Sequence, residues 1–389
     1  MEKDKMTQAG SFNFDLQVTD SNARRGVIKT PHGSFNTPAF MPVGTSGAVK
    51  AMTAEDLEAC GAEIILGNTY HLYLRPGADL IKRRGGLASF NSWNKPTLTD
   101  SGGFQVFSMQ DLLKVDDEGV IFKSHHNGST HHFKAEKVIE IQRDIGADII
   151  MSFDQCVPYP ADQKLAQDGV RRTFDWAGIG KKHFDNLESA DPTGISLFGI
   201  IQGSTNKELR KTSADQITSL DFPGYAVGGL AVGEPKNEME DTLAHTIQFM
   251  PEDKPRYLMG VGYPEDILMA VSHGIDMFDC VLPTRNARTG MVFTSEGPLV
   301  FRNAVNADDG RPLDPDCKCR VCQRYSRSYI RHLYNQSEIT ALVLATFHSA
   351  WFFQELMRNI RSAIENGKFN DFRKEFLEKY QNNHGDGKV

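Results

Sequence analysis

An alternation of short apolar runs with longer amphipathic stretches constrains the fold of this 389-residue chain most strongly. The stretches favour helices: Ala135–Ile145 places branched apolar side chains at helical spacing, and Thr53 with Asp56 forms a capping pattern. Eight runs are expected to form strands, namely Ala39–Val43, Glu63–Leu66, Thr97–Thr99, Asp148–Phe153, Ser196–Ile201, Tyr225–Val227, Arg256–Met259 and Met277–Leu282. Strands that alternate with crossover helices form a parallel sheet. A count of eight favours a closed (β/α)8 TIM barrel, an α/β fold, over an open doubly wound sheet.

Residues 12–38 lie outside this alternation. Apolar and polar residues alternate there around turn signals such as Pro31-His32-Gly33, which predicts antiparallel strands. We expect these strands to form a lid or plug for the barrel.

Charge and hydropathy bear on the location and partners of the chain. The N-terminus lacks the apolar stretch of a secretory leader, and the most apolar later run, Ile339–Phe353, is interrupted by Thr, His and Ser. We therefore expect a soluble, cytoplasmic protein with no membrane association. The formal net charge of −7, taken alone, counts against a nucleic-acid partner. A local basic segment can nevertheless bind RNA on an acidic protein.

The cysteines are unevenly distributed. Cys317, Cys319 and Cys322 fall within six residues, whereas the other three are isolated. Without an export signal, crowded cysteines indicate a metal site before a disulfide, and the alternative is a merely reduced cluster. Three thiolates and one histidine would complete a closed tetrahedral shell, so one structural Zn²⁺ per chain is expected. Spacing leaves His332 and His348 as candidates for the fourth ligand.

These patterns divide the chain into three expected parts. Residues 1–38 form antiparallel strands, and residues 39–300 form the catalytic (β/α)8 barrel. Residues 301–389 form a zinc-binding subdomain with C-terminal helices that pack on the barrel.

Polar residues and glycines gather at the predicted carboxyl ends of the strands, where TIM barrels place their active sites. They are Asn68, Asp100, Asp154, Gln202, Gly228, Gly229, Gly260 and Asp279. Each aspartate has an ordinary structural alternative, since Asp100 could cap a helix and Asp279 could be satisfied by backbone amides. However, apolar residues flank Asp279, and a carboxylate there is poorly solvated. The convergence of three carboxylates and two amides favours a catalytic rim.

Two segments of this rim suit a nucleotide. The glycines after Asp100 permit close approach of a ligand to the backbone, and Phe104 offers a flat face for a base. Arg285 and Arg288 follow the run that contains Asp279. Planar guanidinium groups favour phosphate, although most arginine pairs belong to solvated surface.

Motifs spread over nearly the whole chain resemble those of the tRNA-guanine transglycosylases. Besides the cysteine cluster they are Asp100–Phe107 (DSGGFQVF), Ser152–Cys156 (SFDQC), Gly199–Gly203 (GIIQG), Tyr225–Gly233 (YAVGGLAVG), Tyr257–Gly262 (YLMGVG) and Asp279–Arg285 (DCVLPTR). The resemblance implies an irregular TIM barrel with a zinc-binding subdomain, and it selects His348 as the fourth ligand. It also implies a pentosyltransferase that exchanges one base of a tRNA.

The resemblance makes Asp279 the nucleophile and Asp100 the general acid/base. In such chemistry a carboxylate attacks C1′ of the ribose, and the base departs through an oxocarbenium-like transition state. A second displacement by the incoming base restores the anomeric configuration. The leaving guanine must gain a proton and the incoming base must lose one, so a single ionisable group can serve both steps.

The residues that the resemblance places around the base complement a guanine-like edge. Asp154 is expected to accept from the ring N–H and the exocyclic amine, while Gln202 and the backbone N–H of Gly229 donate to the carbonyl oxygen. Phe104 and Met259 are expected to sandwich the ring, although Met259 alone is also typical of barrel core. The complete predicted substrate-binding set is Ser101, Gly102, Gly103, Phe104, Asp154, Gln202, Gly229, Leu230 and Met259.

Two loops beside the nucleophile are expected to contact RNA. A base must leave its stack to enter a barrel pocket, which favours a loop nucleotide such as the anticodon wobble position. The predicted RNA-binding residues are Gly260, Val261, Gly262, Tyr263, Pro264, Glu265, Asp266, Thr284, Arg285, Asn286, Ala287 and Arg288.

Within the family, Cys156 and Val232 match the bacterial pattern. That type is implied to replace guanine 34 of tRNAs with GUN anticodons by preQ1, in queuosine biosynthesis, and to work as a homodimer. A eukaryotic-type queuine-inserting enzyme is the alternative within the family. Two other classes are a non-catalytic RNA-binding subunit of the same fold, which would lack the two key carboxylates, and a TIM-barrel glycoside hydrolase, which would not need the zinc cluster.

Overall fold

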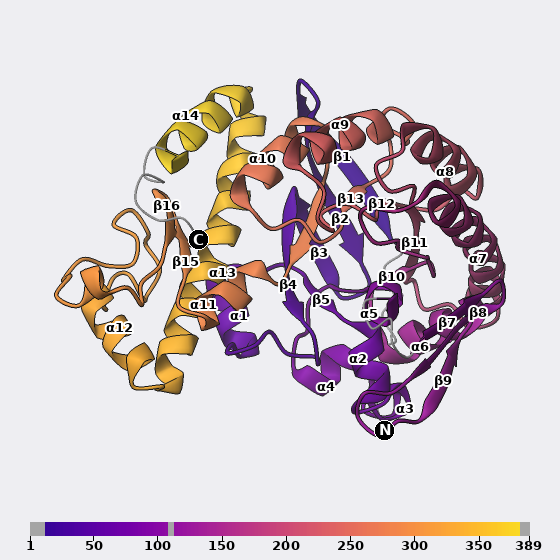
Figure 1. Ribbon diagram of the computed structural model, residues 1–389, viewed down its shortest axis with the longest axis horizontal. Coiled ribbons are helices and arrows are strands. Elements are labelled where there is room, and N and C mark those ends of the chain that lie inside the picture. Colours follow the sequence, from indigo (N-terminus) through magenta and orange to yellow (C-terminus); the bar gives the residue numbers. More distant parts are fainter. Residues whose placement is uncertain (1–11, 108–112, 382–389) are drawn as a thin grey trace, which may run out of the picture.

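The predicted strands close into a parallel barrel. In the computed structural model, which describes residues 12–107 and 113–381, the strand order is β10-β11-β12-β13-β14-β4-β5-β6 (Figure 1). The strands are β4 (Ala39–Gly44), β5 (Ile65–Gly67), β6 (Thr97–Thr99), β10 (Ile149–Met151), β11 (Ser196–Ile201), β12 (Tyr225–Val227), β13 (Arg256–Leu258) and β14 (Met277–Cys280). The barrel closes where β14 pairs with β4, with Met277 opposite Ala39. The TIM-barrel prediction is confirmed, and each of the eight runs supplies one strand.

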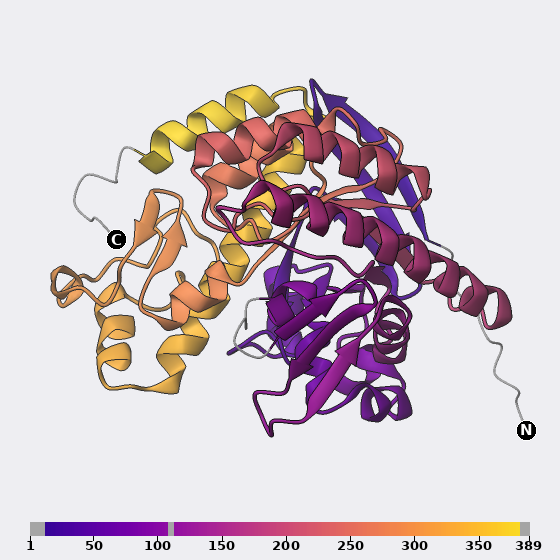
Figure 2. The same cartoon turned by 45° about the vertical axis from the view of Figure 1, so that its right-hand side comes forward.

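Helices connect the strands and cover the outside of the barrel (Figures 1 and 2). They are α1 (Ala54–Cys60), α2 (Thr69–Leu74), α3 (Ala78–Arg83), α4 (Gly86–Asn91), α5 (Gly103–Phe107), α6 (Ala135–Ile145), α7 (Gln163–Ala190), α8 (Lys207–Ser219), α9 (Lys236–Ile247), α10 (Pro264–Ser272) and α11 (Leu282–Arg288). Helix α6 has the predicted bounds, and Thr53 caps α1 by accepting from the N–H of Asp56 at 3.1 Å. Leu282, predicted to end a strand, begins α11 instead, with Pro283 in its first turn.

A three-stranded antiparallel sheet is inserted between β6 and β10 in the chain. It contains β7 (Leu113–Asp116), β8 (Gly119–Lys123) and β9 (Thr130–Phe133). This sheet was not predicted from the sequence, because the histidine-rich segment around β9 lacks a clear apolar alternation.

The N-terminal strands form the expected antiparallel sheet. Its members are β1 (Asn13–Asp20), β2 (Ala23–Thr30) and β3 (Gly33–Thr37). Ile28 and Phe35 are fully buried among residues of the barrel interior, so the sheet packs against the barrel core. The expectation about a leader rests on residues 1–11, which lie outside the described ranges.

Two buried aspartates fix this sheet to the amino ends of the barrel strands. Asp148 directly precedes β10 and accepts from the N–H of His32 at 2.8 Å. Asp276 directly precedes β14 and accepts from Nε of Arg24 at 3.1 Å and from the N–H of Arg256 at 2.8 Å. The sheet therefore plugs the barrel at the end opposite the carboxyl rim.

Helix α13 joins the barrel to the C-terminal part of the chain (Figure 1). The remaining elements are β15 (Val292–Thr294), β16 (Gly297–Leu299), the 3-10 helix η2 (Ala304–Asn306), α12 (Arg327–Asn335), α13 (Ile339–Glu365) and α14 (Phe369–Gln381). On the barrel side, Gln354 of α13 donates to the carbonyl oxygen of Phe40 in β4 at 3.0 Å, and Arg361 donates to that of Pro38 at 2.9 Å. Among the described residues, no helix is long and apolar enough to cross a membrane.

The Arg24–Asp276 pair is expected to contribute strongly to stability, because both side chains are almost completely buried. Asp276→Ala leaves a buried guanidinium without its anion and should lower the free energy of unfolding by about 3–5 kcal/mol. Urea unfolding followed by circular dichroism measures this change. Asp215→Ala, which removes an exposed ion pair with Lys211, is the control and should hardly move the midpoint. Equal midpoints for the two variants would contradict the prediction.

Candidate active site

Three aspartates meet at the carboxyl rim of the barrel. Asp100 follows β6, Asp154 lies just beyond β10, and Asp279 is part of β14. Asp279 is close enough for its charge to raise the pKa of Asp100. The structure thus brings together carboxylates that are far apart in the sequence, as the barrel topology requires.

Asp100 is held by donors from two strand ends. Its Oδ1 accepts from the N–H of Thr69 at 2.8 Å, and its Oδ2 accepts from Asn68 at 2.5 Å and from Gln105 at 2.8 Å. Burial and, to a smaller extent, the nearby charge of Asp279 raise the pKa of Asp100 to about 6, against these three hydrogen bonds, which favour the charged form. A carboxyl group with a pKa near neutrality can both donate and accept a proton at physiological pH.

Asp154 is the centre of a second hydrogen-bonded group. Its Oδ1 accepts from the hydroxyl of Ser101 at 2.8 Å, and its Oδ2 accepts from Gln202 at 2.7 Å. Burial raises the pKa of Asp154, and both hydrogen bonds oppose that rise. A Cβ atom at Gly103 would lie 2.8 Å from the carbonyl oxygen of Asp154, so this glycine is needed for contact with the protein's own backbone.

Asp279 has two unequal oxygens. Its Oδ1 accepts from the hydroxyl of Tyr257 at 2.5 Å and from the N–H of Gly260 at 2.9 Å. Among the described residues, none donates a hydrogen bond to its Oδ2. The side chain is partly exposed, yet desolvation by the surrounding protein raises its pKa, against the two hydrogen bonds. The carboxylate is therefore anchored through one oxygen and open through the other.

The remaining predicted base-binding residues surround these carboxylates. Phe104, on α5, is 55% exposed, which is unusual for a large apolar side chain. Met259 is partly buried and packs on the barrel interior. Gly229 has a φ of +65°, and a Cβ atom there would lie 2.4 Å from Oε1 of Gln202. Gln202 and Gly229 are therefore in direct contact.

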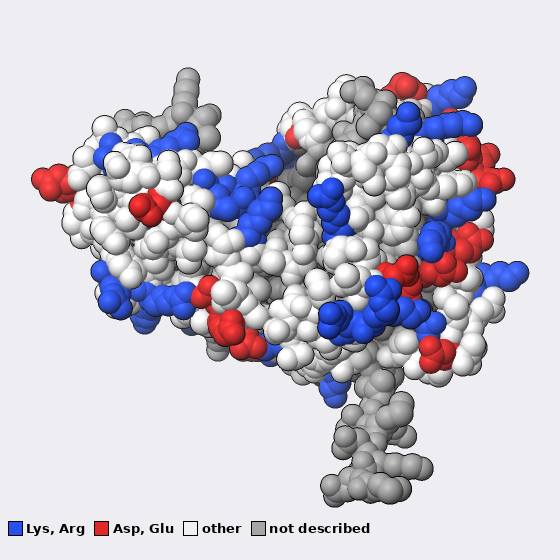
Figure 3. Space-filling model, turned by 90° about the horizontal axis from the view of Figure 1, so that it is seen from below, with Lys and Arg blue, Asp and Glu red and all other residues white. Residues whose placement is uncertain are grey.

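The predicted RNA-binding residues differ in how much surface they offer. Exposed members are Gly260, Tyr263 and Arg285, and partly exposed members are Glu265, Asp266, Asn286 and Arg288. Buried members are Val261, Gly262, Pro264, Thr284 and Ala287. Partial burial, and then the charge of Arg285, lower the pKa of Arg288, so the two guanidinium groups are close neighbours. In Figure 3, Lys and Arg side chains border a hollow that crosses the middle of the face.

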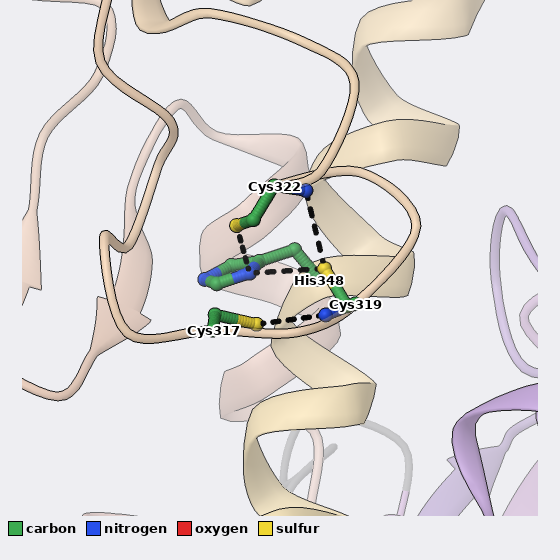
Figure 4. A group of neighbouring side chains, drawn as sticks. All are labelled: Cys317, Cys319, Cys322 and His348. Atoms are coloured by element: carbon green, nitrogen blue, oxygen red, sulfur yellow. Dashed lines mark hydrogen bonds between the residues drawn. The ribbon is translucent and has the colours of Figure 1, made fainter.

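The cysteine cluster meets one histidine. The ligand atoms of Cys317, Cys319, Cys322 and His348 all lie within 4.8 Å of one another (Figure 4). Nδ1 of His348 is 3.3 Å from the sulfur of Cys322, and its Nε2 donates to the carbonyl oxygen of Phe293 at 3.0 Å. This hydrogen bond fixes the tautomer that leaves Nδ1 free to bind a metal. His348 is thus the histidine at the cluster, and the four residues can hold a metal ion.

Comparisons with known proteins agree with this architecture. The sequence profile of the queuine tRNA-ribosyltransferase family matches residues 19–382. The chain belongs to this family. Similar relatives named queuine tRNA-ribosyltransferase include one from Thermoanaerobacter sp. (strain X514), 54% identical over 95% of this chain and 98% of the relative. Others are from Halothermothrix orenii, 53% identical over 96% and 98%, and Francisella tularensis subsp. novicida, 51% identical over 95% and 99%. The chain is accordingly a transglycosylase, an enzyme of the pentosyltransferase class.

Several residues of the site were absent from the predicted set for this family. Tyr257 lies inside an apolar strand, where its hydroxyl group gave no separate signal. Gln105 follows Phe104 in a recognised motif but was assigned no role. Asn68 was noted only as a polar strand end. Arg210 lies on a helix, and no sequence pattern connects it with the pocket.

The pKa of Asp100 is expected to depend on Asn68. Asn68→Ala removes a donor that stabilises the ionised carboxylate, so the pKa should rise further above 6. Titration of ¹³C-labelled aspartate side chains by NMR measures this. Asn306→Ala removes a buried asparagine that donates to backbone carbonyls instead, and it should leave the pKa of Asp100 unchanged. A fall in the pKa of Asp100 on loss of Asn68 would contradict the conclusion that Asn68 stabilises the ionised carboxylate.

Proposed function

We propose that this enzyme replaces guanine 34 of tRNAs with GUN anticodons by preQ1, through a covalent aspartyl-ribose intermediate. The observation that carries the proposal is the pairing of two carboxyl groups with different surroundings. Asp279 has one anchored and one open oxygen, while Asp100 has a pKa of about 6. Two carboxyl groups in different surroundings commonly take different roles, one as general acid/base and the other as nucleophile.

The first displacement begins at the open oxygen of Asp279. Oδ2 attacks C1′ of the ribose, the bond from C1′ to the guanine nitrogen breaks, and Asp100 gives a proton to the departing base. Tyr257 and Gly260 hold Oδ1, so the orientation of the nucleophile is fixed before the substrate binds.

The second displacement reverses these events with a new base. The ionised Asp100 takes a proton from the incoming preQ1, whose ring nitrogen attacks C1′ while the bond to Oδ2 breaks. Two inversions retain the anomeric configuration, as in retaining glycosidases. The enzyme returns to its starting protonation state, since the proton lost by Asp100 in the first step is regained in the second.

The Asp154 group is proposed to recognise the base in both steps. Asp154 accepts from the ring N–H and the exocyclic amine, and Gln202 with the Gly229 N–H donates to the carbonyl oxygen. Without a base, Gln202 donates to Asp154, and its Oε1 lies buried without a partner among the described residues. Ser101, Gly102, Gly103 and Leu230 complete the pocket, and Phe104 and Met259 flank the ring.

The tRNA is proposed to lie across the rim beside Asp279. Exposed Tyr263 suits stacking with an unpaired base, and Arg285 with Arg288 suits the phosphate backbone. Figure 3 shows Lys and Arg side chains beside a hollow, so a chain whose formal net charge is −7 still offers a local basic surface. Five of the predicted RNA-binding residues are buried, three of them in helices α10 and α11, and we assign these five to packing within the protein.

The choice of preQ1 over queuine rests on two residues that match the bacterial pattern and on the bacterial origin of the relatives, whose name itself refers to queuine. Cys156 is partly exposed beside the pocket, and burial raises its pKa to about 12, so it presents a neutral thiol. Cys156 and Val232 match the bacterial pattern, and the relatives compared above come from bacteria. A cytoplasmic location follows from a tRNA substrate.

We further propose that Cys317, Cys319, Cys322 and His348 hold a structural Zn²⁺. Tetrahedral zinc with Zn–S bonds of about 2.3 Å places its ligand atoms about 3.8 Å apart, which fits the cluster. Four protein ligands leave no open position for catalysis.

The homodimer expected for the family would need an exposed apolar surface, and Val305 and Ile339 in the C-terminal part are 84% and 74% exposed.

Asp279→Asn is expected to abolish the covalent intermediate. Asparagine keeps an oxygen that can accept from Tyr257 and Gly260, but it lacks the free anionic oxygen. Incubation with unmodified tRNA followed by denaturing electrophoresis measures the protein–RNA adduct. Asp253→Asn, an exposed change, is the control and should retain the adduct. A denaturation-resistant adduct in Asp279→Asn would assign the attack to another group.

Cys319→Ser is expected to release the metal and to unfold the C-terminal part of the chain. The matched control is Cys60→Ser, because Cys60 is also fully buried but lies outside the cluster. Elemental analysis gives the zinc content, and calorimetry gives the melting temperature. Loss of base exchange in Cys319→Ser with unchanged zinc content and stability would contradict a structural role.

A further inference from the structure

Arg210 is a fully buried arginine next to the proposed base pocket. It projects from α8, has 0% exposed surface, and forms no ion pair with any described residue. Burial lowers its pKa to about 10, so the guanidinium remains charged at neutral pH. An isolated buried cation is costly unless its hydrogen bonds are satisfied.

Carbonyl oxygens satisfy this guanidinium group. Nη1 donates to Gly228 at 2.7 Å and to Ile201 at 3.1 Å, and Nη2 donates to Gly229 at 3.2 Å. Nε donates to the carbonyl oxygen of Ser204 at 2.6 Å. Arg210 therefore binds the carboxyl ends of β11 and β12 in the segment that carries Gln202 and Gly229.

The two glycine carbonyls determine where the next two N–H groups point. In a trans peptide the N–H is opposite to the carbonyl of the same unit. The carbonyls of Gly228 and Gly229 both point to Arg210, so the N–H groups of Gly229 and Leu230 point away from it. The left-handed conformation of Gly229, with φ of +65°, allows the N–H groups of Gly229 and Leu230 to lie on the same side of the backbone. The Gly229 N–H indeed reaches toward the sulfur of Cys156, where it opposes the burial-driven rise of that pKa.

We infer that Arg210 is a positioning residue that holds the N–H groups of Gly229 and Leu230 as a paired donor for the carbonyl oxygen of the purine base. This inference rests on the proposed function. The guanidinium acts through the backbone and does not touch the base. Such a preorganised pair stabilises negative charge on the carbonyl oxygen as the base leaves or enters.

A purely structural role for Arg210 leads to a different prediction. Its loss would lower stability and weaken binding of every base alike. A positioning role instead concerns one acceptor atom, so its loss weakens only those bases that carry a strong acceptor at that position. Guanine and 6-thioguanine separate the two cases, since they share the ring N–H and the amine while sulfur is the weaker acceptor.

The experiment compares the affinities of both bases for the wild-type enzyme and Arg210→Lys. Equilibrium dialysis with labelled guanine, with 6-thioguanine as competitor, gives the dissociation constants. Lysine keeps the charge but lacks the planar fork that binds both glycine carbonyls. We expect guanine to bind about tenfold more weakly to the variant, with little change for 6-thioguanine. The preference for the oxygen-bearing base should therefore collapse.

Arg256→Lys is the matched control. Arg256 is also buried and donates to two backbone carbonyls, those of Pro251 and Met250, at the opposite end of the barrel. This variant should retain the preference for guanine. An Arg210→Lys variant that retains it, or that loses both bases equally, overturns the inference.

Two further measurements keep the test decisive. If Arg210→Lys does not fold, the same two affinities are measured for Arg210→Gln. If that variant does not fold either, the wild-type affinities for guanine and 6-thioguanine decide, and equal affinities overturn the inference. Exchange of labelled guanine into tRNA by the wild type is measured first. Its absence contradicts the proposed function, whereas its presence with an unchanged preference in Arg210→Lys contradicts only the role of Arg210.

Discussion

The cost of burying carboxylates governs the arrangement of this barrel. Each buried aspartate needs hydrogen-bond donors. Because the parallel strands all end at the same edge of the barrel, neighbouring strand ends supply these donors. At the amino ends, Asp148 and Asp276 accept from the N-terminal sheet and so attach it to the barrel. At the carboxyl ends, Asp100 and Asp154 accept from side chains of neighbouring strand ends. One physical requirement therefore produces a structural contact at one end and a reactive group at the other.

The fold could be predicted because its signals are local and repeated. Runs such as Tyr225–Val227 and Ser196–Ile201 match the strands residue for residue, since buried parallel strands are predominantly apolar. The sheet of β7 to β9 escaped prediction because the histidines of β9 obscure its apolar alternation, although Val120, Phe122 and Phe133 of this sheet are buried. Leu282 was misplaced for a related reason: an apolar residue at a strand end does not reveal where the backbone turns into a helix.

The candidate site was predictable in its charged residues and only partly in their partners: Ser101 and Gln202 were in the predicted set, whereas Tyr257 and Gln105 were not. A carboxylate at a strand end is conspicuous in a sequence, whereas the hydroxyl of Tyr257 is hidden in an apolar strand. The neighbours of Asp154 show a second limit. The glycines after Asp100 suggested space for a ligand, but Gly103 makes room for the backbone carbonyl of Asp154. Contacts between distant segments decide such cases, and sequence spacing does not contain them.

The cysteine–histidine cluster and Asp279, the proposed nucleophile, lie in different parts of the chain, yet helix α13 contacts both the cluster and the barrel. His348 projects from α13 to the cysteines, and Gln354 of the same helix donates to Phe40 in β4. Strand β4 pairs with β14, where Met41 lies opposite Asp279. Because β4 and β14 close the barrel, α13 supports the pair of strands that carries Asp279. A closed metal site can thus serve the chemistry by fixing the position of a helix, without any ligand reaching the substrate.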